Sequence, residues 1–252
     1  MLNKKLLPVA VAAALTGGFS ATQAQAEVEV SGNVALTSDY RFRGISQSDE
    51  SVAVQGGFDL GFENGIYIGT WGSSVDFDDS GNLGSLELDY YVGWASDIGD
   101  SGFGIDIGYF YYDYPGDDGD SEGDYQEFAA TVSFGDLGVG IVYSDDYYAG
   151  TDEFWYLSAD YGFAISDAFS LGFHLGYNML EETKLDSFGN VTDGGFLSSD
   201  EDQYYDYSVT ATYSVAGVDL SLAYIGTDLD DDDVFGTDWA DDTAVISISK
   251  SL

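Results

Sequence analysis

The chain contains no cysteine, and only one of its two prolines, Pro115, lies beyond residue 26. It therefore has no disulfide framework and no residue for lipoprotein attachment, and proline rarely interrupts a potential strand. Cationic side chains are also scarce: 6 Lys and Arg stand against 46 Asp and Glu, giving a net charge of −40. Because phosphate groups need Lys and Arg to neutralise them, this composition excludes nucleic acid as a partner.

Long apolar runs are missing as well. After the N-terminal segment no run reaches the roughly 18 apolar residues of a membrane-spanning helix, so the sequence excludes a helical membrane protein. Strong acidity can indicate disorder. However, 16% of the residues are aromatic and 33 are glycine, a composition typical of porin-like barrels.

The first 26 residues have the pattern of a secretory signal peptide. Lys4 and Lys5 precede a short apolar run at 6–17, and Ala24-Gln25-Ala26 has the small-residue form of a cleavage site. Cleavage before Glu27 would leave 226 residues (252 − 26). Loss of the two lysines would change the net charge from −40 to −42. We expect one exported domain at 27–252 and no second domain.

Alternation of apolar and polar residues dominates the rest of the chain. Val28, Val30 and Val34 share one parity, and Glu29, Ser31 and Asn33 share the other. Successive side chains of a strand point to opposite faces, so the pattern predicts a strand between an apolar and a polar medium. Twelve stretches show it: 28–40, 51–63, the one after Gly65, 86–98, 103–114, 125–134, 137–143, 154–163, 169–180, 203–214, 218–227 and 243–252.

Connections between these stretches are alternately short and long. Asn64-Gly65 is a strong signal for a two-residue type I′ turn, which would place Phe62 opposite Tyr67 and Phe58 opposite Trp71. Gly135-Asp136 would likewise place Phe134 opposite Leu137. Both pairings continue one apolar face from strand to strand. Ile66 and Ile68 depart from this pattern, because they fall on its polar side.

The predicted fold is all-β: a single antiparallel transmembrane β-barrel of about 12 strands, located in the outer membrane. Each stretch is about ten residues long, enough for a tilted strand to cross a bilayer, and unpaired edges in lipid would force the sheet to close. An even strand number puts both termini and the short turns on the periplasmic side and the long acidic loops outside.

Aromatic residues lie near both ends of the predicted strands, on the parity that faces outward. They predict two aromatic girdles, one at each membrane–water interface. One set would lie near the short turns: Phe62, Tyr67, Trp94, Phe103, Phe134, Phe163, Phe169 and Tyr213. The other would lie near the long loops: Tyr40, Phe77, Tyr111, Tyr143, Trp155, Tyr177, Tyr205 and Tyr224.

Several motifs carry a family resemblance. They are the run 38–47 (SDYRFRGISQ), followed by 54–59 (VQGGFD), 69–73 (GTWGS), 75–77 (VDF) and 111–116 (YYDYPG). With them the chain resembles the TorF family of porins of Gram-negative bacteria. The resemblance implies an outer-membrane barrel with pore function, and it implies no catalytic residues. Barrel C-termini commonly end in an aromatic residue, whereas this chain ends in Leu252.

Arg41 and Arg43 are the only arginines, and their parity faces the lumen. An arginine facing lipid at mid-membrane would cost about 2–4 kcal/mol, which supports a lumenal position. They could orient permeant molecules opposite acids such as Asp39. Alternatively, they form a structural salt-bridge cluster that fixes the first loop, an interpretation the sequence slightly favours.

Acidic residues on the lumen parity predict a cation-preferring pore, because few cationic residues are available to pair with them. The candidates to line or constrict the pore, besides Asp39 and the two arginines, are Asp59, Glu63, Glu87, Asp89, Asp106, Glu127, Asp160 and Asp206, with Glu29 and Asp219 sharing their parity. The alternative is that these acids only keep the lumen wet, which would give little selectivity.

Runs of aspartate in the long loops could bind Ca²⁺ or Mg²⁺ weakly through carboxylate oxygens, at Asp117, Asp118 and Asp120 or at Asp230 and Asp232. The run from Asp228 lacks the glycine and glutamate of an EF-hand loop, so solvated charge is the better interpretation. His174, the only histidine, has too few companions for a zinc site or a catalytic dyad. We expect neither enzyme activity nor a cofactor.

The sequence thus predicts a passive diffusion channel for small hydrophilic solutes. Its partners would be outer-membrane lipid, lipopolysaccharide and the barrel-assembly machinery. One alternative is a non-conducting structural or adhesive barrel whose loops bind ligands or ions. Another is a soluble periplasmic barrel, which the apolar outward parity opposes.

Overall fold

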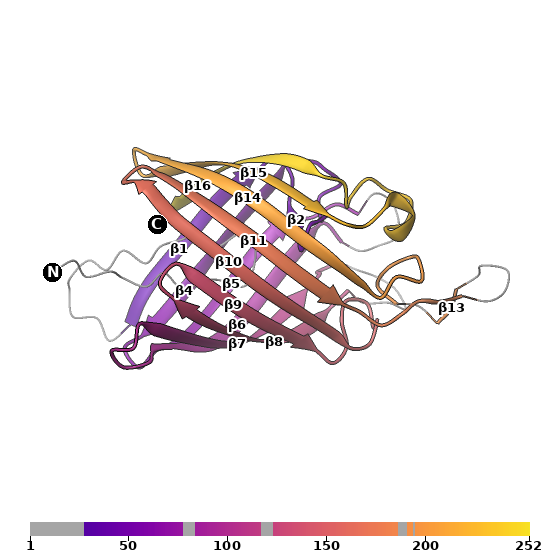
Figure 1. Cartoon of the computed structure of the whole chain (residues 1–252), viewed down its shortest axis with the longest axis horizontal. Coiled ribbons are helices and arrows are strands. Elements are labelled where there is room, and N and C mark those ends of the chain that lie inside the picture. The colour runs from indigo at the N-terminus through magenta and orange to yellow at the C-terminus, as the bar shows by residue number, and fades with distance from the viewer. Residues whose placement is uncertain (1–27, 78–83, 117–122, 186–190, 194) are drawn as a thin grey trace.

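The computed structural model describes residues 28–77, 84–116, 123–185, 191–193 and 195–252. Twelve long strands form one closed antiparallel barrel (Figure 1), as the sequence predicts. They are β1 (Val28–Thr37), β4 (Ala53–Phe62), β5 (Ile66–Ser74), β6 (Leu86–Asp97), β7 (Phe103–Asp113), β8 (Tyr125–Phe134), β9 (Leu137–Ser144), β10 (Phe154–Ser166), β11 (Phe169–Met179), β14 (Gln203–Val215), β15 (Val218–Thr227) and β16 (Thr243–Ser251).

Each long strand pairs with its neighbour along the chain, and β1 closes the ring against β16. The closing register runs from Asn33 opposite Ser251 to Thr37 opposite Ser247. Hydrogen bonds extend it at both ends, because the Leu252 amide donates to the Gly32 carbonyl and the Ser38 amide to the Ile246 carbonyl. Closure leaves no long strand with an unpaired edge.

Short and long connections separate cleanly to the two ends of the barrel (Figure 1). The short ones are 63–65, 98–102, 135–136, 167–168 and 216–217; the long ones are 38–52, 75–85, 114–124, 145–153, 180–202 and 228–242. Three of the long loops contain small elements: the hairpin of β2 (Arg41–Phe42) and β3 (Ile45–Ser46), that of β12 (Lys184–Leu185) and β13 (Val191–Asp193), and the 3₁₀ turn η1 (Asp231–Asp233). No helix in the described ranges is long and apolar enough to span a bilayer.

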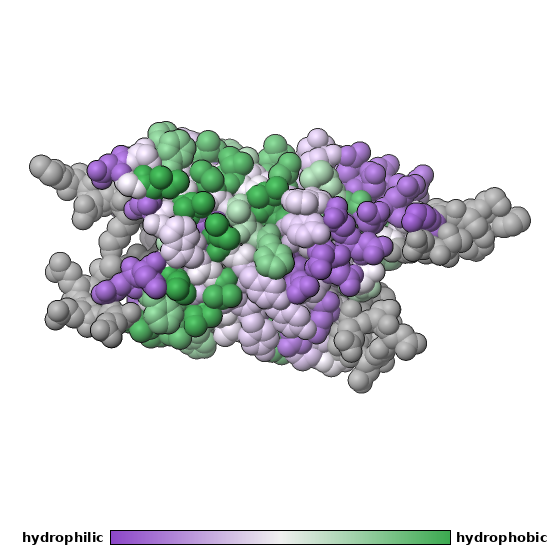
Figure 2. Space-filling view, turned by 90° about the horizontal axis from the view of Figure 1, so that it is seen from below, coloured by the Kyte–Doolittle hydropathy of each residue, from purple (hydrophilic) through white to green (hydrophobic). Residues whose placement is uncertain are grey.

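The outer surface of the barrel wall is apolar. Val30, Phe58, Phe128, Leu222 and Ile246 are each more than half exposed, and all lie on the parity predicted to face outward. On the face shown in Figure 2, apolar residues gather in the middle and toward the short turns, whereas hydrophilic residues gather toward the long loops. An exposed apolar surface of this extent marks an interaction with another apolar phase.

The first short turn corrects the predicted register by one residue. Gly61 pairs with Tyr67, and Gly57 pairs with Trp71. The turn therefore spans the three residues 63–65 and not Asn64-Gly65 alone. The Gly65 amide donates to the Phe62 carbonyl at 2.9 Å, and Gly65 has φ +88°, which fits a type I turn followed by a left-handed glycine. By contrast, the predicted pairing of Phe134 with Leu137 is confirmed.

This one-residue shift turns β5 over. Ile66 and Ile68 face outward, at 41% and 42% exposure, so they no longer break the apolar pattern. Tyr67 and Trp71 point inward instead, and the Tyr67 hydroxyl donates to Asp106 Oδ1 at 2.7 Å. The assignment of Tyr67 to a lipid-facing girdle was wrong for this reason.

Two other predicted girdle residues also lie inside. Tyr40 is 5% exposed because β1 ends at Thr37 and the chain then turns into the barrel. Phe77, beyond the end of β5, packs against Tyr114 and Trp239. Nine girdle residues are exposed on the outside: Trp94, Phe103, Phe134, Phe163, Tyr213, Tyr111, Trp155, Tyr205 and Tyr224.

The buried core lies inside the barrel, toward the long loops. One cluster centres on Trp71, Tyr112, Tyr125 and Phe154, and a second joins Ile45, Leu197, Tyr204 and Trp239. Part of this packing needs glycine: a Cβ on Gly69 would stand 2.3 Å from the Tyr91 ring. The barrel is therefore filled by aromatic side chains over part of its length.

If the outer face contacts lipid, the free-energy cost of placing a charged residue on it should depend on the depth of that residue in the membrane. Leu222→Arg in the middle of β15 should destabilise the folded barrel in lipid by about 2–4 kcal/mol, because the guanidinium would replace an apolar group in hydrocarbon. Leu137→Arg beside a short turn should cost less than about 1 kcal/mol. Urea titration in vesicles measures both, and equal effects would contradict a membrane-facing wall.

Candidate functional site

The first loop, residues 38–52, folds into the lumen instead of standing away from it. The β2–β3 hairpin forms its tip, with Arg43 and Gly44 as the two turn residues, at φ +48° and +85°. Both values suit a type I′ turn. Gly44 lies so close to the end of β15 that a Cβ there would meet Thr227 Cγ2 at 2.3 Å. The tip of the hairpin therefore packs against β15, which only β16 separates from β1.

Arg43 anchors this hairpin to β8. Its Nη1 and Nη2 atoms donate to Glu127 Oε1 at 2.7 Å and Oε2 at 2.9 Å. Both side chains are almost fully buried, at 5% and 2% exposure. In the barrel order β8 lies nearly opposite β1. The pair thus holds the loop across the full width of the lumen.

Aromatic rings enclose the Arg43 guanidinium. Its Cζ atom lies 4.5 Å from the Phe42 ring centroid and 4.6 Å from those of Phe154 and Tyr156, with Tyr147 at 5.8 Å. Ring faces attract a cation placed over them, more strongly where water is excluded. Burial opposes the charged form, but the Glu127 carboxylate together with Tyr147 and Tyr112 raises the pKa of Arg43. We define Phe42, Tyr147, Phe154 and Tyr156 as the Arg43 box.

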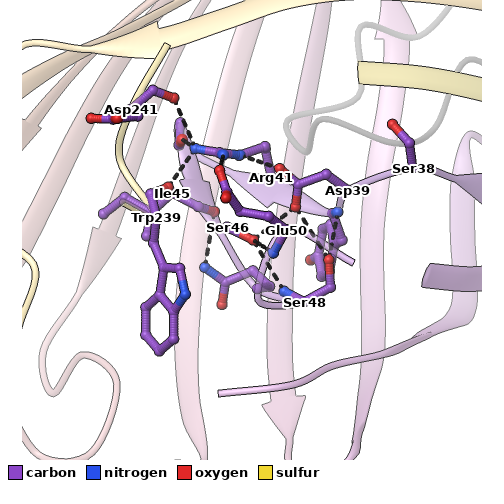
Figure 3. A network of polar contacts seen from close by, with 12 residues as sticks. Ser38, Asp39, Arg41, Ile45, Ser46, Ser48, Glu50, Trp239 and Asp241 are labelled. Atoms are coloured by element: carbon purple, nitrogen blue, oxygen red, sulfur yellow. Dashed lines mark hydrogen bonds and ion pairs between the residues drawn. The ribbon is translucent and has the colours of Figure 1, made fainter. Parts of the chain in front are cut away.

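Arg41 fixes the loop to itself and to loop 228–242 (Figure 3). Its Nη2 pairs with Glu50 Oε1 at 2.8 Å and its Nε with Asp39 Oδ2 at 2.5 Å. Its Nη1 donates to the carbonyls of Gly44, Trp239 and Asp241. Partial burial and the neighbouring Asp238 raise the pKa of Glu50, while Arg41 acts in the opposite direction.

Asp39 completes the same network. Its Oδ1 accepts hydrogen bonds from Ser46 Oγ at 2.7 Å and Ser48 Oγ at 3.2 Å (Figure 3). The Asp39 side chain thus ties Arg41 to the far side of the loop. Together these contacts join residues of the first loop to one another and to loop 228–242.

Tyrosine hydroxyls satisfy most of the other lumen acids. Glu87 accepts from Tyr40 at 2.8 Å and from Tyr114 at 3.1 Å. Asp59 accepts from Tyr91 at 2.5 Å, and Asp106 accepts from Tyr67. These partners are neutral hydroxyl groups, so they hydrogen-bond the carboxyl groups without forming ion pairs.

Asp160 and Asp206 meet at His174. Its Nδ1 lies 2.7 Å from Asp160 Oδ1, and its Nε2 lies 2.9 Å from Asp206 Oδ1. The Tyr156 hydroxyl contacts His174 Nε2 at 2.7 Å, which links this cluster to the Arg43 box. Asn178 Nδ2 holds the second oxygen of Asp206 at 2.8 Å.

Two predicted lumen residues differ from this pattern. Glu63 lies in the short turn 63–65 and is exposed at the end of the barrel, away from the first loop. Asp89 is buried at 9% exposure, and its Oδ1 meets no hydrogen-bond donor among the described residues. Of the candidate lining residues, Glu63 is therefore the one that the fold does not bring into the interior.

Only some of the aspartates predicted to bind divalent ions lie among the described residues. Asp117, Asp118 and Asp120 lie outside the described residues. Asp230 and Asp232 are exposed at η1, where the Asp230 amide donates to the Asp233 carboxylate as part of a capping box. In the described ranges no group of three or more acidic, His or Cys residues has the geometry to hold a metal ion.

Sequence reasoning missed the aromatic lining of the lumen. Phe154, Tyr156, Tyr112, Tyr125 and Tyr204 are all at most 5% exposed. Their polar-face parity was a usable signal, because each of β7, β8, β10 and β14 has one tyrosine and one acid on that parity. Tyr204 even contacts the hairpin directly, since its hydroxyl donates to the Arg43 carbonyl at 3.2 Å.

The Arg43–Glu127 pair predicts a non-additive mutational response. Arg43→Met should destabilise the barrel by about 3–5 kcal/mol, because it leaves the Glu127 charge buried and unpaired. The double variant Arg43→Met with Glu127→Gln should recover most of this loss. A double-mutant cycle by urea unfolding measures the coupling, and additive effects would contradict a tight pair.

Comparison with solved structures finds the same fold in outer-membrane channels. An outer membrane channel from Pseudomonas putida F1 superposes with a TM-score of 0.53 and 12% identity, covering 90% of this chain and 96% of that one. The NanC porin superposes with a TM-score of 0.50 and 10% identity, covering 88% and 98%. At such identities the likeness shows a shared barrel architecture.

Comparison with curated proteins finds no match in sequence. A family model does match: the one described as "Bacterial protein of unknown function (Gcw_chp)" aligns with residues 21–252. This range covers every strand of the barrel and the whole first loop. The chain therefore belongs to the Gcw_chp family of bacterial proteins.

Proposed function

We propose that this protein is a porin-like channel of the outer membrane, exported by a signal peptide at 1–26 that is then removed. The observation that carries the proposal is the combination of a closed barrel, an apolar outer wall and an interior lined by acids and tyrosines. A wall exposed to lipid and a polar interior are the two faces of a pore-forming barrel. The solutes would be small and hydrophilic, and the resemblance to the TorF porins points the same way.

A cation preference follows from the charges of the lumen. Arg43 and Arg41 are each matched by carboxylates, Glu127 for the first and Asp39 with Glu50 for the second. Asp59 and Asp106, both partly exposed, have only neutral tyrosine hydroxyls as their hydrogen-bond donors in the described structure. The charge facing a permeant ion is therefore negative, which attracts cations and repels anions.

Constriction of the pore is assigned to the first loop. The β2–β3 hairpin and the surrounding rings occupy the half of the lumen near the long loops. Passage would be confined to narrow paths beside the hairpin, so a small unitary conductance is expected. In this scheme Arg41 and Arg43 act by holding the constriction in place.

Selectivity is the first test of the channel. Reversal potentials in planar bilayers under a KCl gradient should have the sign of cation preference. The double variant Asp59→Asn with Asp106→Asn should reduce that preference, since it removes two lumen charges and keeps groups that accept tyrosine hydroxyls. Glu153→Gln, exposed outside the lumen, is the matched control. Anion selectivity of the wild type would exclude the proposal.

The filled lumen favours a second candidate, a non-conducting structural or adhesive barrel. Replacing residues 41–46 with a Gly-Ser linker of equal length separates the two. A channel should conduct before the change and show severalfold larger conductance after it. A barrel that serves another role should conduct only after the change. Single-channel recording gives the result. A difference in electrophoretic migration between unheated and heated samples in detergent confirms that the variant is folded.

A further inference from the structure

A cavity of about 410 Å³ lies on the long-loop side of the Arg43 box, and we call it the outer pocket. Ten of its sixteen lining residues are aromatic, and they come from all six long connections and from β8 and β14. The aromatic lining includes Phe42, Phe77, Tyr147, Phe196, Phe235 and Trp239. The volume is in the range of small-molecule sites.

Ring faces surround this space from several directions. The Phe77 centroid lies 6.2 Å from that of Tyr114 and 6.4 Å from that of Trp239. On another side, Phe196 packs 5.2 Å from Tyr147. Phe235, 66% exposed and at φ +58°, extends from loop 228–242 as a large apolar side chain open to solvent. The pocket is therefore an aromatic cage with an exposed aromatic residue among its lining.

Charge around the cage is strongly negative. Loop 228–242 supplies Val234, Phe235, Thr237 and Trp239, and it also carries eight aspartates and no cationic residue. Asp49 reaches the cage directly, because its Oδ1 accepts from Trp239 Nε1 at 2.8 Å. Such a field concentrates cations and repels anions at the entrance.

Cation binding by these rings already occurs within the same lumen. The Arg43 guanidinium sits between three ring faces at 4.5–4.6 Å. Two residues of that box, Phe42 and Tyr147, also line the outer pocket. The Arg43 charge itself is paired with Glu127. Because Glu127 balances this charge, Arg43 does not exclude a second cation from the adjacent outer pocket.

We propose that the outer pocket binds an organic cation with an apolar body, such as an aromatic or alkyl quaternary ammonium compound. The rings would contact both the apolar body and the charge, and the acidic loop would supply the long-range attraction. Cages of this kind recognise quaternary ammonium groups in other proteins. The site does not require conduction, so a barrel that passes no current can still bind this ligand.

Binding is tested with benzyltrimethylammonium on the purified, folded full-length barrel by isothermal titration calorimetry. Benzyl alcohol and benzoate serve as neutral and anionic probes of similar size. The cation should bind about tenfold tighter than benzyl alcohol, given the strength of a desolvated cation–π contact, and benzoate should bind weakest. Equal binding of benzoate and the cation, or no binding of the cation at millimolar concentration, would overturn the proposal.

Variants locate the site. Trp239→Leu should weaken binding of the cation at least fivefold, because it removes a ring face while keeping the surface apolar. Phe196→Leu is the second variant, in case Trp239→Leu does not fold. Trp94→Leu on the outer wall, 40% exposed, is the matched control and should bind as the wild type does. A loss as large in the control would show that the ligand binds elsewhere.

Discussion

Closure of the ring between β1 and β16 is the constraint on which the rest of this structure depends. Once the seam from Asn33 to Thr37 is paired, every long strand has two neighbours and the wall separates an outside from an inside. The outside can then be apolar throughout, because no backbone group needs water there. The inside becomes a confined polar space, where each charge must find a partner or a hydrogen-bond donor.

In the first loop two cationic residues, Arg41 and Arg43, supply partners for buried carboxylates. They lie two residues apart in the chain, yet they bind different parts of the structure. Arg41 binds carbonyls and carboxylates close to it, and so gives the loop its shape. Arg43 reaches across to Glu127 on β8, and so gives the loop its position. Because the hairpin touches β7, β8, β10, β14 and β15, it also braces the wall from within.

The periodic part of the molecule could be predicted from sequence, and the parts without a period could not. Alternation identified the strands and, except in β5, their outward faces because it reports a local geometric rule. Tyr40 and Phe77 lie just beyond strand ends, where parity no longer tells which way a side chain points. Arg41 and Arg43 stood out by scarcity, but their partners Glu127 and Trp239 are 84 and 198 residues away in the chain. Only the closed barrel brings them together.

The three-residue turn at 63–65 has a consequence for how this chain can change over generations. Removal of one residue there would rotate β5 so that Tyr67 and Trp71 faced outward and the isoleucines faced inward. The cost of lengthening or shortening a short connection therefore depends on whether the number of residues added or removed is odd or even, because an odd number reverses the faces of the strand. Apart from the first loop, which is packed inside the lumen, the long loops at the other end can gain or lose residues of either parity, since they do not set a register. Insertions should accumulate at one end of the barrel only, which leaves the lipid-facing wall fixed while the other rim diversifies.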